Sequence, residues 1–230
     1  MTPTEKIIHL AKRCGPIFRL ADTLSFTYKT LRDRRHNRLR NKAYGWITRD
    51  IIGRGNHIEL RAGSLFKGLR IGIRGNNNRI IVESGCYIGP GCLIWAEGDD
   101  NTIVIGRGVS MTGQCQINAQ EKSTTIRIGD DCMLANNIHI RTSDAHKIVD
   151  AATGQRLNQA ADVNIGSHVW IAPNTKILKG AAIADGCIVG SDSTVTGLFP
   201  DANCLIVGRP ARAVKTGITW NRDNVLKIFD

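Results

Sequence analysis

The feature that most constrains the fold is a strict spacing of six between aliphatic residues in the C-terminal half of the chain. The residues at this spacing are Ile165, Ile171, Ile177, Ile183, Val189 and Val195. A period of six fits neither the 3.6-residue period of an α-helix nor the two-residue period of a plain β-strand. It fits a short strand followed by a corner, so that three units make one triangular coil of 18 residues. The sequence therefore predicts an all-β solenoid whose stacked coils satisfy one another's backbone hydrogen bonds.

The same phase appears upstream in three blocks that start 23 residues apart. The block positions are Val82, Ile88, Ile94, Ile105, Met111, Ile117, Ile128, Leu134 and Ile140. A distance of 23 is one 18-residue coil plus five residues, and we predict that residues 97–101 and 121–125 form these insertions as polar loops. Leu60 and Phe66 mark an earlier, fainter turn. The solenoid is therefore expected at residues 57–207, between an N-terminal segment (1–56) and a cap and tail (208–230).

Cysteines follow the repeat. Five of the seven lie four residues after a repeat aliphatic, namely Cys86, Cys92, Cys115, Cys132 and Cys187. We expect these side chains to point inward as compact hydrophobes, whereas a nucleophile or a metal ligand would have to face out. Reduced thiols are expected because the chain has no secretion signal, and the absence of a CxxC motif argues against a zinc ribbon.

Positive charge is concentrated before the repeat. The formal net charge is +11, and residues 1–56 hold 13 Lys and Arg against 4 Asp and Glu. Pro16 can start a helix, and the apolar spacing over residues 17–31 predicts an amphipathic helix within a basic helical N-terminal segment. The basic face is either solvated or attracted to an anionic membrane surface or an acidic glycan. A nucleic acid partner is not expected, because no recognised binding motif accompanies the charge.

Nothing in the sequence predicts membrane insertion. No apolar run approaches the roughly 20 residues that cross a bilayer, and the N-terminus has no apolar segment of signal-peptide length. We therefore expect a cytoplasmic protein, with peripheral contact to the inner membrane through the basic N-terminus as an open alternative.

Four motifs carry a resemblance to a known family: IRTSDAHKI (140–148), IGSHVWIAPNTKILKG (165–180), IVGSDSTVT (188–196) and IVGRPARAVK (206–215). On these motifs the sequence resembles the hexapeptide-repeat acyltransferases, and within them the O-acetyltransferases of bacterial capsule and lipopolysaccharide sugars. The resemblance implies a left-handed parallel β-helix, a homotrimer, acetyl-CoA as the donor, and active sites between neighbouring subunits. The left hand rests on the resemblance alone, since the usual crossover rule predicts the opposite hand.

The repeat is interrupted once, between Ile140 and Ile165, where 25 residues replace the expected six. The insertion runs from Arg141 to Asp162 and contains His146. Acetyl transfer from a thioester to a hydroxyl needs a base, and a neutral imidazole suits that role near pH 7. His146 is our candidate catalytic base. The resemblance implies the same role, since His146 matches the family's loop histidine and Trp170 matches a tryptophan that lines the donor or acceptor pocket.

Other residues near the insertion keep alternatives open. His139 lies between two inward aliphatics, so it should face outward as a rival base or a lining residue. Asp144 could orient the His146 imidazole or simply form a turn. Trp170 should also face outward, for carbohydrate stacking, coenzyme contact or trimer packing. A zinc site built from His139, His146 and His168 is not expected, because their spacing does not match that of the β-helix carbonic anhydrases.

Donor-binding residues are predicted at the end of the solenoid. Gly190, Ser191 and Thr196 resemble the family's coenzyme-binding hexads, although Gly197 stands where the family often has Lys. The basic residues after the last coil, Arg209, Arg212 and Lys215, either bind coenzyme phosphates or form a solvated turn. We expect the tail, residues 218–230, to form a short helix over the open end of the prism.

The leading prediction is O-acetyl transfer from acetyl-CoA to a sugar hydroxyl of a surface polysaccharide or lipopolysaccharide. Alternatives are acetylation of a small-molecule acceptor (an antibiotic or a nucleotide-sugar amine), a β-helix carbonic anhydrase, and a non-catalytic scaffold. The insertion argues against the scaffold, because packing alone gains nothing from a projecting loop.

Overall fold

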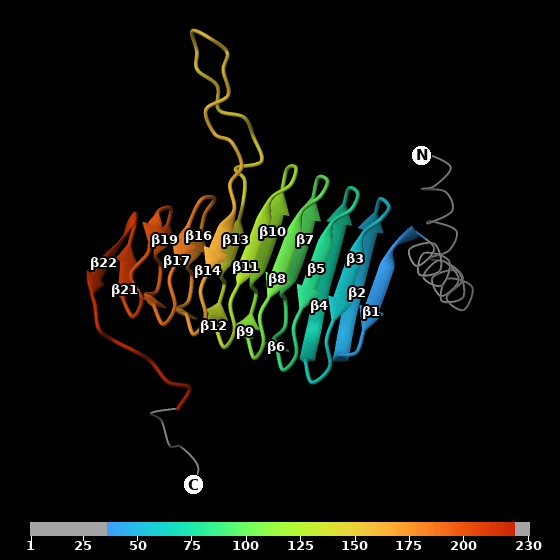
Figure 1. Ribbon diagram of the computed structural model, residues 1–230, viewed down its shortest axis with the longest axis horizontal. Helices are drawn as coiled ribbons and strands as arrows, with labels where there is room; N and C mark the ends of the chain where they lie inside the picture. The colour runs from blue at the N-terminus through green and yellow to red at the C-terminus, as the bar shows by residue number, and fades with distance from the viewer. Residues whose placement is uncertain (1–35, 224–230) are drawn as a thin grey trace, which may run out of the picture. The chain divides into compact units, whose positions relative to one another are not determined.

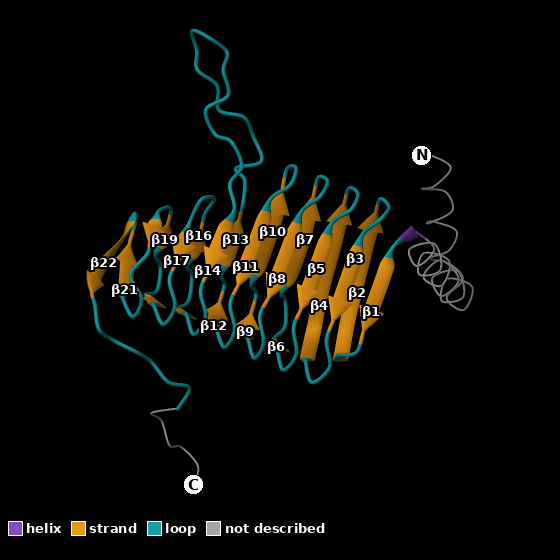
Figure 2. Ribbon diagram, viewed as in Figure 1, coloured by secondary structure: helices purple, strands orange, loops and turns teal. Residues whose placement is uncertain are grey.

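Short strands of nearly uniform direction are stacked side by side along the described part of the chain (Figures 1 and 2). The computed structural model describes residues 36–223, and almost all of them belong to one unit that begins at Leu39. The helix predicted over residues 17–31 lies outside the described residues. The described unit is an all-β solenoid, as the six-residue period predicted.

Each coil contributes one strand to each of three faces. Face 1 is a sheet of β1 (Arg38–Asn41), β3 (His57–Leu60), β5 (Arg79–Val82), β8 (Thr102–Ile105), β11 (Thr125–Ile128), β14 (Val163–Ile165), β17 (Ala182–Ile183) and β20 (Leu198–Phe199). The other two faces share the long strand β4 (Leu65–Arg74), whose first residues pair with β6 and whose last residues pair with β7.

Face 2 continues from β4 through β6 (Tyr87–Ile88), β9 (Ser110–Gly113), β12 (Met133–Asn136), β15 (Trp170–Ile171), β18 (Ile188–Val189), β21 (Leu205–Gly208) and β22 (Ala211–Lys215). Face 3 contains β2 (Tyr44–Ile52), β4, β7 (Leu93–Glu97), β10 (Gln116–Gln120), β13 (His139–Arg141), β16 (Lys176–Ile177) and β19 (Thr194–Val195). In the described part of the chain, the solenoid strands from β2 to β21 pair in parallel, and β22 pairs with β21 in the antiparallel sense.

The repeat aliphatics form the core. All six residues of the C-terminal series and all nine of the upstream blocks are buried. The five cysteines predicted to point inward are also buried, and the six cysteines of residues 36–223 are free thiols. Burial raises the pKa of the Cys86 thiol to about 11 and that of Cys132 to about 12, so these thiols stay protonated at neutral pH. The prediction of packing cysteines is confirmed.

The predicted polar loops are confirmed at residues 98–101 and 121–124, which turn between strands. Only the outermost residue of each predicted loop is strand, because Glu97 ends β7 and Thr125 begins β11. The turns are held by a ladder of polar side chains that are buried at the corner between face 3 and face 1. Its members are Asn56, Asn78, Asn101, Thr124 and Thr142.

Each rung of this corner ladder bonds to the next coil. Asn78 Oδ1 accepts a hydrogen bond from the Asn101 main-chain N–H (3.0 Å), and Asn101 Oδ1 accepts from Thr124 N–H (2.9 Å). The last rung joins the hydroxyls of Thr124 and Thr142 at 3.0 Å. Because buried polar groups are costly unless they are bonded, the ladder satisfies corners that would otherwise destabilise the fold.

Both ends of the solenoid differ from the prediction. Strands β1 and β2 lie within residues 1–56, which we had assigned to the helical segment, and β2 pairs in parallel with β4. The six-residue spacing is hard to detect in β1 and β2, because basic and aromatic side chains face outward there. At the other end, residues 211–215 form β22 rather than part of a turn, and residues 218–223 contain no helix. Among residues 36–223, no helix has the length and apolar character to span a membrane.

Candidate active site

The insertion forms an arm, residues 142–162, that leaves the solenoid between β13 and β14, at the corner of faces 3 and 1 (Figure 1). The two sides of the arm pair with each other: Leu157 N–H donates to Ile148 O and Asp150 N–H donates to Gln155 O, both at 2.8 Å. Ile148, Val149 and Leu157 are about half exposed. Exposed apolar side chains on a projecting arm are suited to contact with another surface.

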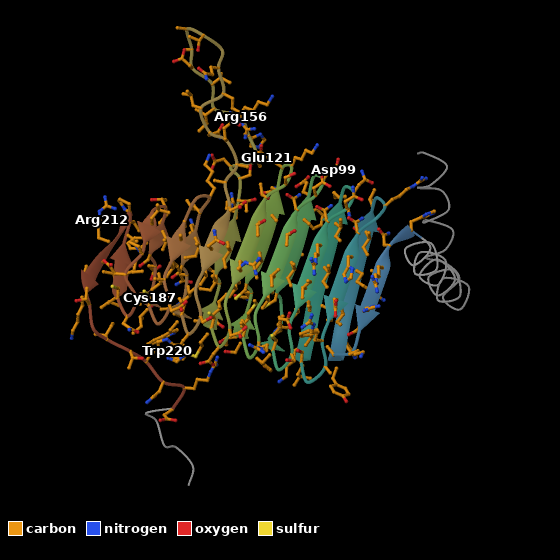
Figure 3. The ribbon with its side chains drawn as sticks, in the orientation of Figure 1. Asp99, Glu121, Arg156, Cys187, Arg212 and Trp220 are labelled. Atoms are coloured by element: carbon orange, nitrogen blue, oxygen red, sulfur yellow. The ribbon has the colours of Figure 1, made fainter. Side chains whose placement is uncertain are left out.

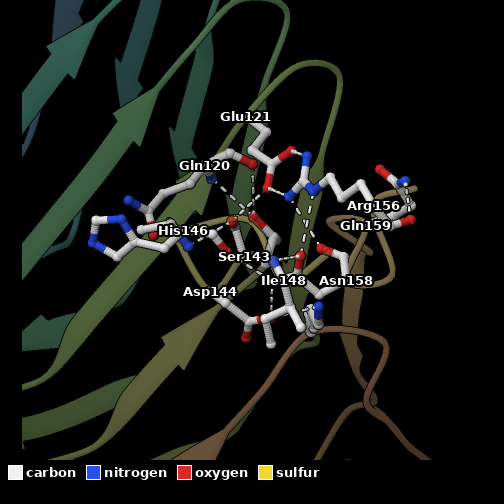
Figure 4. A network of polar contacts seen from close by, with 12 residues as sticks. Gln120, Glu121, Ser143, Asp144, His146, Ile148, Arg156, Asn158 and Gln159 are labelled. Carbon is white, nitrogen blue, oxygen red and sulfur yellow. Dashed lines mark hydrogen bonds and ion pairs between the residues drawn. The ribbon is translucent and has the colours of Figure 1, made fainter. Parts of the chain in front are cut away.

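An ion pair between Arg156 and Glu121, which we call the buckle, ties the returning side of the arm to the solenoid where the arm begins. The Arg156 guanidinium donates to both carboxylate oxygens of Glu121, at 2.7 and 2.6 Å, and Ser143 Oγ donates to the same carboxylate at 2.6 Å (Figure 4). Arg156 and then Ser143 lower the pKa of Glu121 to about 2. Since Glu121 belongs to the preceding coil, this buckle ties the returning limb of the arm to the solenoid.

A second set of contacts holds the residues around His146. Asp144 Oδ2 accepts from Lys179 Nζ (2.6 Å) and from Asn158 Nδ2 (2.8 Å). The same Asn158 amide donates to the main-chain oxygen of His146 (2.8 Å) and accepts from Ile148 N–H (2.7 Å). Lys179 and then Asn158 lower the pKa of Asp144, which keeps this carboxylate charged. The backbone on both sides of His146 is therefore fixed.

The His146 ring itself is exposed and points away from these contacts (Figure 4). Of the two alternatives for Asp144, orientation of the imidazole has no contact behind it in the described residues, where the Asp144 carboxylate bonds to Lys179 and Asn158. Asp144 reaches His146 only through Asn158, and at the main chain rather than at the ring.

His139 lies on face 3, three residues before the arm starts. Its Nε2 is 3.1 Å from Asn137 Oδ1, and its ring is half-buried. Burial, with Arg141 and Lys176 nearby, lowers the pKa of His139, so the imidazole is neutral at pH 7. It faces outward, as predicted.

Trp170 opens β15 on face 2, at a different edge from the arm. The tail crosses this edge: the Trp220 ring lies 6.4 Å from Trp170 and stacks on His168 at 4.3 Å. His168 Nδ1 pairs with Asp131 at 2.7 Å. Figure 3 shows Trp220 below the strands and Arg156 above them. A single chain therefore does not bring Trp170 and His146 together.

Sequence reasoning missed this tail contact. Trp220 Nε1 donates to His168 O at 2.8 Å, and Arg222 donates to Asp131 and to Ser110 Oγ at 2.9 and 2.8 Å. The available signal was a tryptophan, Trp220, two residues before an arginine, Arg222. Residues 218–223 run back along the earlier coils, where Arg222 reaches Ser110 and Asp131.

The residues predicted to bind the donor lie at more than one edge. Gly190 and Ser191 lie between β18 and β19, at the corner of faces 2 and 3, and the Arg209 guanidinium pairs with Asp192 there at 2.9 Å. Thr196 lies at the corner that carries the arm. Arg212 and Lys215 are exposed on β22. A Cβ at Gly190 would come within 2.6 Å of Val207, so packing also requires this glycine.

A shallow groove follows the corner of faces 2 and 3 along earlier coils. It has a volume of about 300 Å³ and is lined by Pro90, Gly91, Thr112, Gly113, Gln114 and Asn136. Small residues at this corner leave the backbone open to a ligand. Among residues 36–223, no group of three or more His, Cys, Asp or Glu side chains is placed to hold a metal ion.

Comparisons with known proteins agree with this geometry. The family described as "Bacterial transferase hexapeptide (six repeats)" matches residues 162–197. The chain is 33% identical over 99 residues to a polysialic acid O-acetyltransferase of Escherichia coli O1:K1 / APEC, and 35% identical over 92 residues to one of Neisseria meningitidis. These alignments cover 43% and 40% of this chain, but only 32% and 43% of the two relatives.

A solved structure covers more of the chain. The crystallographic structure of the polysialic acid O-acetyltransferase OatWY is 31% identical, with a TM-score of 0.58, and the match covers 79% of this chain and 94% of that one. Since the likeness extends over nearly the whole of that chain, the protein belongs to the hexapeptide-repeat acetyltransferase family.

Proposed function

We propose that the protein transfers an acetyl group from acetyl-CoA to a hydroxyl of a bacterial surface-polysaccharide or lipopolysaccharide sugar. The observation that carries this proposal is the arm, which presents the exposed ring of His146 from a backbone fixed by Asn158 and by the buckle of Arg156 and Glu121. Relatives named as polysialic acid O-acetyltransferases support a polysaccharide as the acceptor.

In the proposed step, His146 first accepts a proton from the sugar and then returns it to the leaving group. His146 takes the proton of the sugar hydroxyl while the oxygen attacks the thioester carbonyl carbon. When the C–S bond breaks, the imidazolium returns that proton to the departing thiolate, so the products are the acetyl ester and free CoA. General-base help of this kind is worth about 10²–10⁴ in rate.

We infer that the site is completed by a neighbouring subunit of a homotrimer. Trp170 and the arm lie at different edges of one chain, so His146 of one subunit would act beside Trp170 of the next. The half-exposed Ile148, Val149 and Leu157 are suited to such a contact. The left-handed winding implied by the resemblance, and a cytoplasmic location, stay predictions.

The donor is proposed to lie along the corner of faces 2 and 3, where Gly190, Ser191 and the groove leave the backbone accessible. Arg212 and Lys215 form no ion pair within residues 36–223, and Arg212 donates to Ala211 O at 2.9 Å, so both charges can meet the donor's phosphates. Arg209 would first have to leave Asp192. At Gly197 a Cβ would meet no atom within 4 Å, so the position where the family often has Lys is open.

The test is release of free thiol from acetyl-CoA with polysialic acid, lipopolysaccharide and simple sugars as acceptors. The variant His146→Ala should lower the rate about 10²–10⁴-fold and leave the circular dichroism spectrum unchanged. Lys147→Ala, the neighbouring exposed position, is the matched control. A large loss in His139→Ala with near-normal turnover in His146→Ala would instead identify His139 as the base.

A further inference from the structure

The outward side chains of face 3 form three rows that cross the strands, because alternate residues of a strand point to the same side. The strand register assigns row one as Arg70, Leu93, Gln116, His139 and Lys176, row two as Gly72, Trp95, Asn118 and Arg141, and row three as Arg74, Glu97 and Gln120. These face 3 rows combine an aromatic ring, amides and cations, which are the groups that recognise sugars bearing carboxylates.

Trp95 lies against the backbone of the neighbouring strand. A Cβ at Gly72 would fall 2.1 Å from Trp95 Cε3, so only a glycine at that position allows the ring to lie over β4. The Arg74 guanidinium is 5.0 Å from the ring centroid, and Trp95 Nε1 donates to Glu97 at 3.3 Å. These contacts hold the ring in one orientation, and the side chain remains partly exposed.

Asn118 lies between Trp95 and Arg141 in the same row. Its Oδ1 is buried and accepts no hydrogen bond from any residue between 36 and 223. A buried carbonyl oxygen without a donor costs about 1–3 kcal/mol. A ligand that supplies an O–H or N–H there would remove this cost, and sugar hydroxyl and acetamido groups do so.

Cations outnumber anions in the rows. The rows hold four cations, Arg70, Arg74, Arg141 and Lys176, and one carboxylate, Glu97. Arg74 pairs with Asp50 of β2, and Glu97 accepts from Trp95 Nε1 and from Gln120 Nε2 at 3.1 Å. The excess is complementary to carboxylates spaced along a chain of sugars. Because guanidinium groups form forked bonds with carboxylates, arginine is well suited to this contact.

We propose that the face 3 rows bind an extended acidic glycan, with one sugar ring against Trp95 and Asn118 and the chain leading across Arg141 to the arm. The proposal rests on the proposed function and deepens it, since it names an acidic polymer as the acceptor class. Strands are about 4.8 Å apart, so Trp95 and Arg141, two strands apart, are separated by roughly 10 Å. A single sugar cannot span that distance, and a polymer can.

Affinity electrophoresis of the full chain in gels that contain polysialic acid tests the binding directly. Trp95→Ala and Asn118→Leu should each weaken binding about tenfold, as expected when a central aromatic or polar contact is lost. Trp46→Ala, which removes a tryptophan that is 83% exposed on β2, is the matched control and should bind as the parent does. Arg141→Ala is compared in the same way with Arg127→Ala on face 1.

Three outcomes would overturn the proposal: equal binding by Trp95→Ala and Trp46→Ala, equal retardation by neutral dextran, or a change of sedimentation coefficient in Trp95→Ala, which would mean that subunits cover this face. The parent protein should bind polysialic acid more tightly than a fragment of three sialic acid units, and this preference should be lost in Trp95→Ala. Binding through Trp95 without any thiol release would instead refute the proposed function and leave the glycan surface standing.

Discussion

The coils before the arm and the coils after it are built to different lengths. Residue 79 pairs with 102 and 102 with 125, so the early coils take 23 residues, whereas 164 pairs with 182, a coil of 18. The early strands on faces 1 and 3 are mostly four or five residues long, and the late ones are mostly two. The arm leaves the solenoid where the long coils give way to the short ones.

The difference shows where the two parts place their polar groups. The long coils bury the corner ladder, which ends at Thr142, and Thr142 is also the first residue of the arm. The short coils keep small residues at their corners, including Ala181 and Ser193. The long coils therefore provide a rigid base for the arm, and the short coils carry Gly190 and Ser191 of the proposed donor site.

The largest effect is expected when the ladder is broken. Asn101→Ala removes the acceptor of a buried hydrogen bond from Thr124 N–H and the donor of a partly buried one to Glu121 O, so the free energy of unfolding should fall by about 2–3 kcal/mol. Ser193→Ala, in a short coil, removes the acceptor for Gly208 N–H and should cost about 1 kcal/mol. Urea unfolding compares the two. Equal losses would mean that the long coils do not depend on their ladder.

Breaking the buckle should have the opposite balance of effects: a small change in the free energy of unfolding and a larger fall in the rate of acetyl transfer. Arg156→Met breaks both bonds to Glu121, which should lower kcat about tenfold while KM for acetyl-CoA changes less than about twofold. Arg156→Lys keeps the charge without the fork and should recover part of the rate.

A matched control comes from the long coils. Arg107→Met removes a more exposed ion pair, with Asp130, that lies away from the arm and should leave kcat unchanged. An unfolding curve shifted as far in Arg156→Met as in Asn101→Ala would show that the buckle supports the solenoid rather than positions the arm.

The two regions also differ in how far the sequence could predict them. The short coils keep the six-residue period without a gap, so their inward positions from Ile165 to Val195 were predicted residue by residue. In the long coils the aliphatics and the turns at residues 98–101 and 121–124 were predicted, but the burial of Asn101 and Thr124 was not, because Asn and Thr are ordinary turn residues and nothing in one sequence marks them as buried.

The site was predicted less completely for a similar reason. The broken period located the arm and His146, but not the partners of Asp144, because Lys179 and Asn158 become neighbours only after the chain has turned through a coil. Trp220 and Arg222 were assigned to a helix, since the sequence carries no sign that Asp131 and His168 would receive them.

The smallest effect is the pH dependence of the buckle. Arg156 holds the pKa of Glu121 near 2, below its ordinary 4.5, so the stabilisation from this carboxylate is complete above pH 4.5 and is lost as the pH falls towards 2. Hydrogen exchange of Ala145 N–H and Ile148 N–H, which bond to Ser143 Oγ and Asn158 Oδ1, reports on the arm. Their protection factors should stay level from pH 7 to pH 5 and decrease only below about pH 4.

The variant Glu121→Gln separates this titration from general acid unfolding. It cannot ionise, so its arm amides should exchange faster at pH 7 and show a weaker dependence on pH below 4, while amides of β8 and β11 in the long coils keep the protection of the parent. If the arm and the long coils of the parent lost protection together as the pH fell, the arm would not open independently of the solenoid, and the contrast between rigid coils and a separately held arm would not stand.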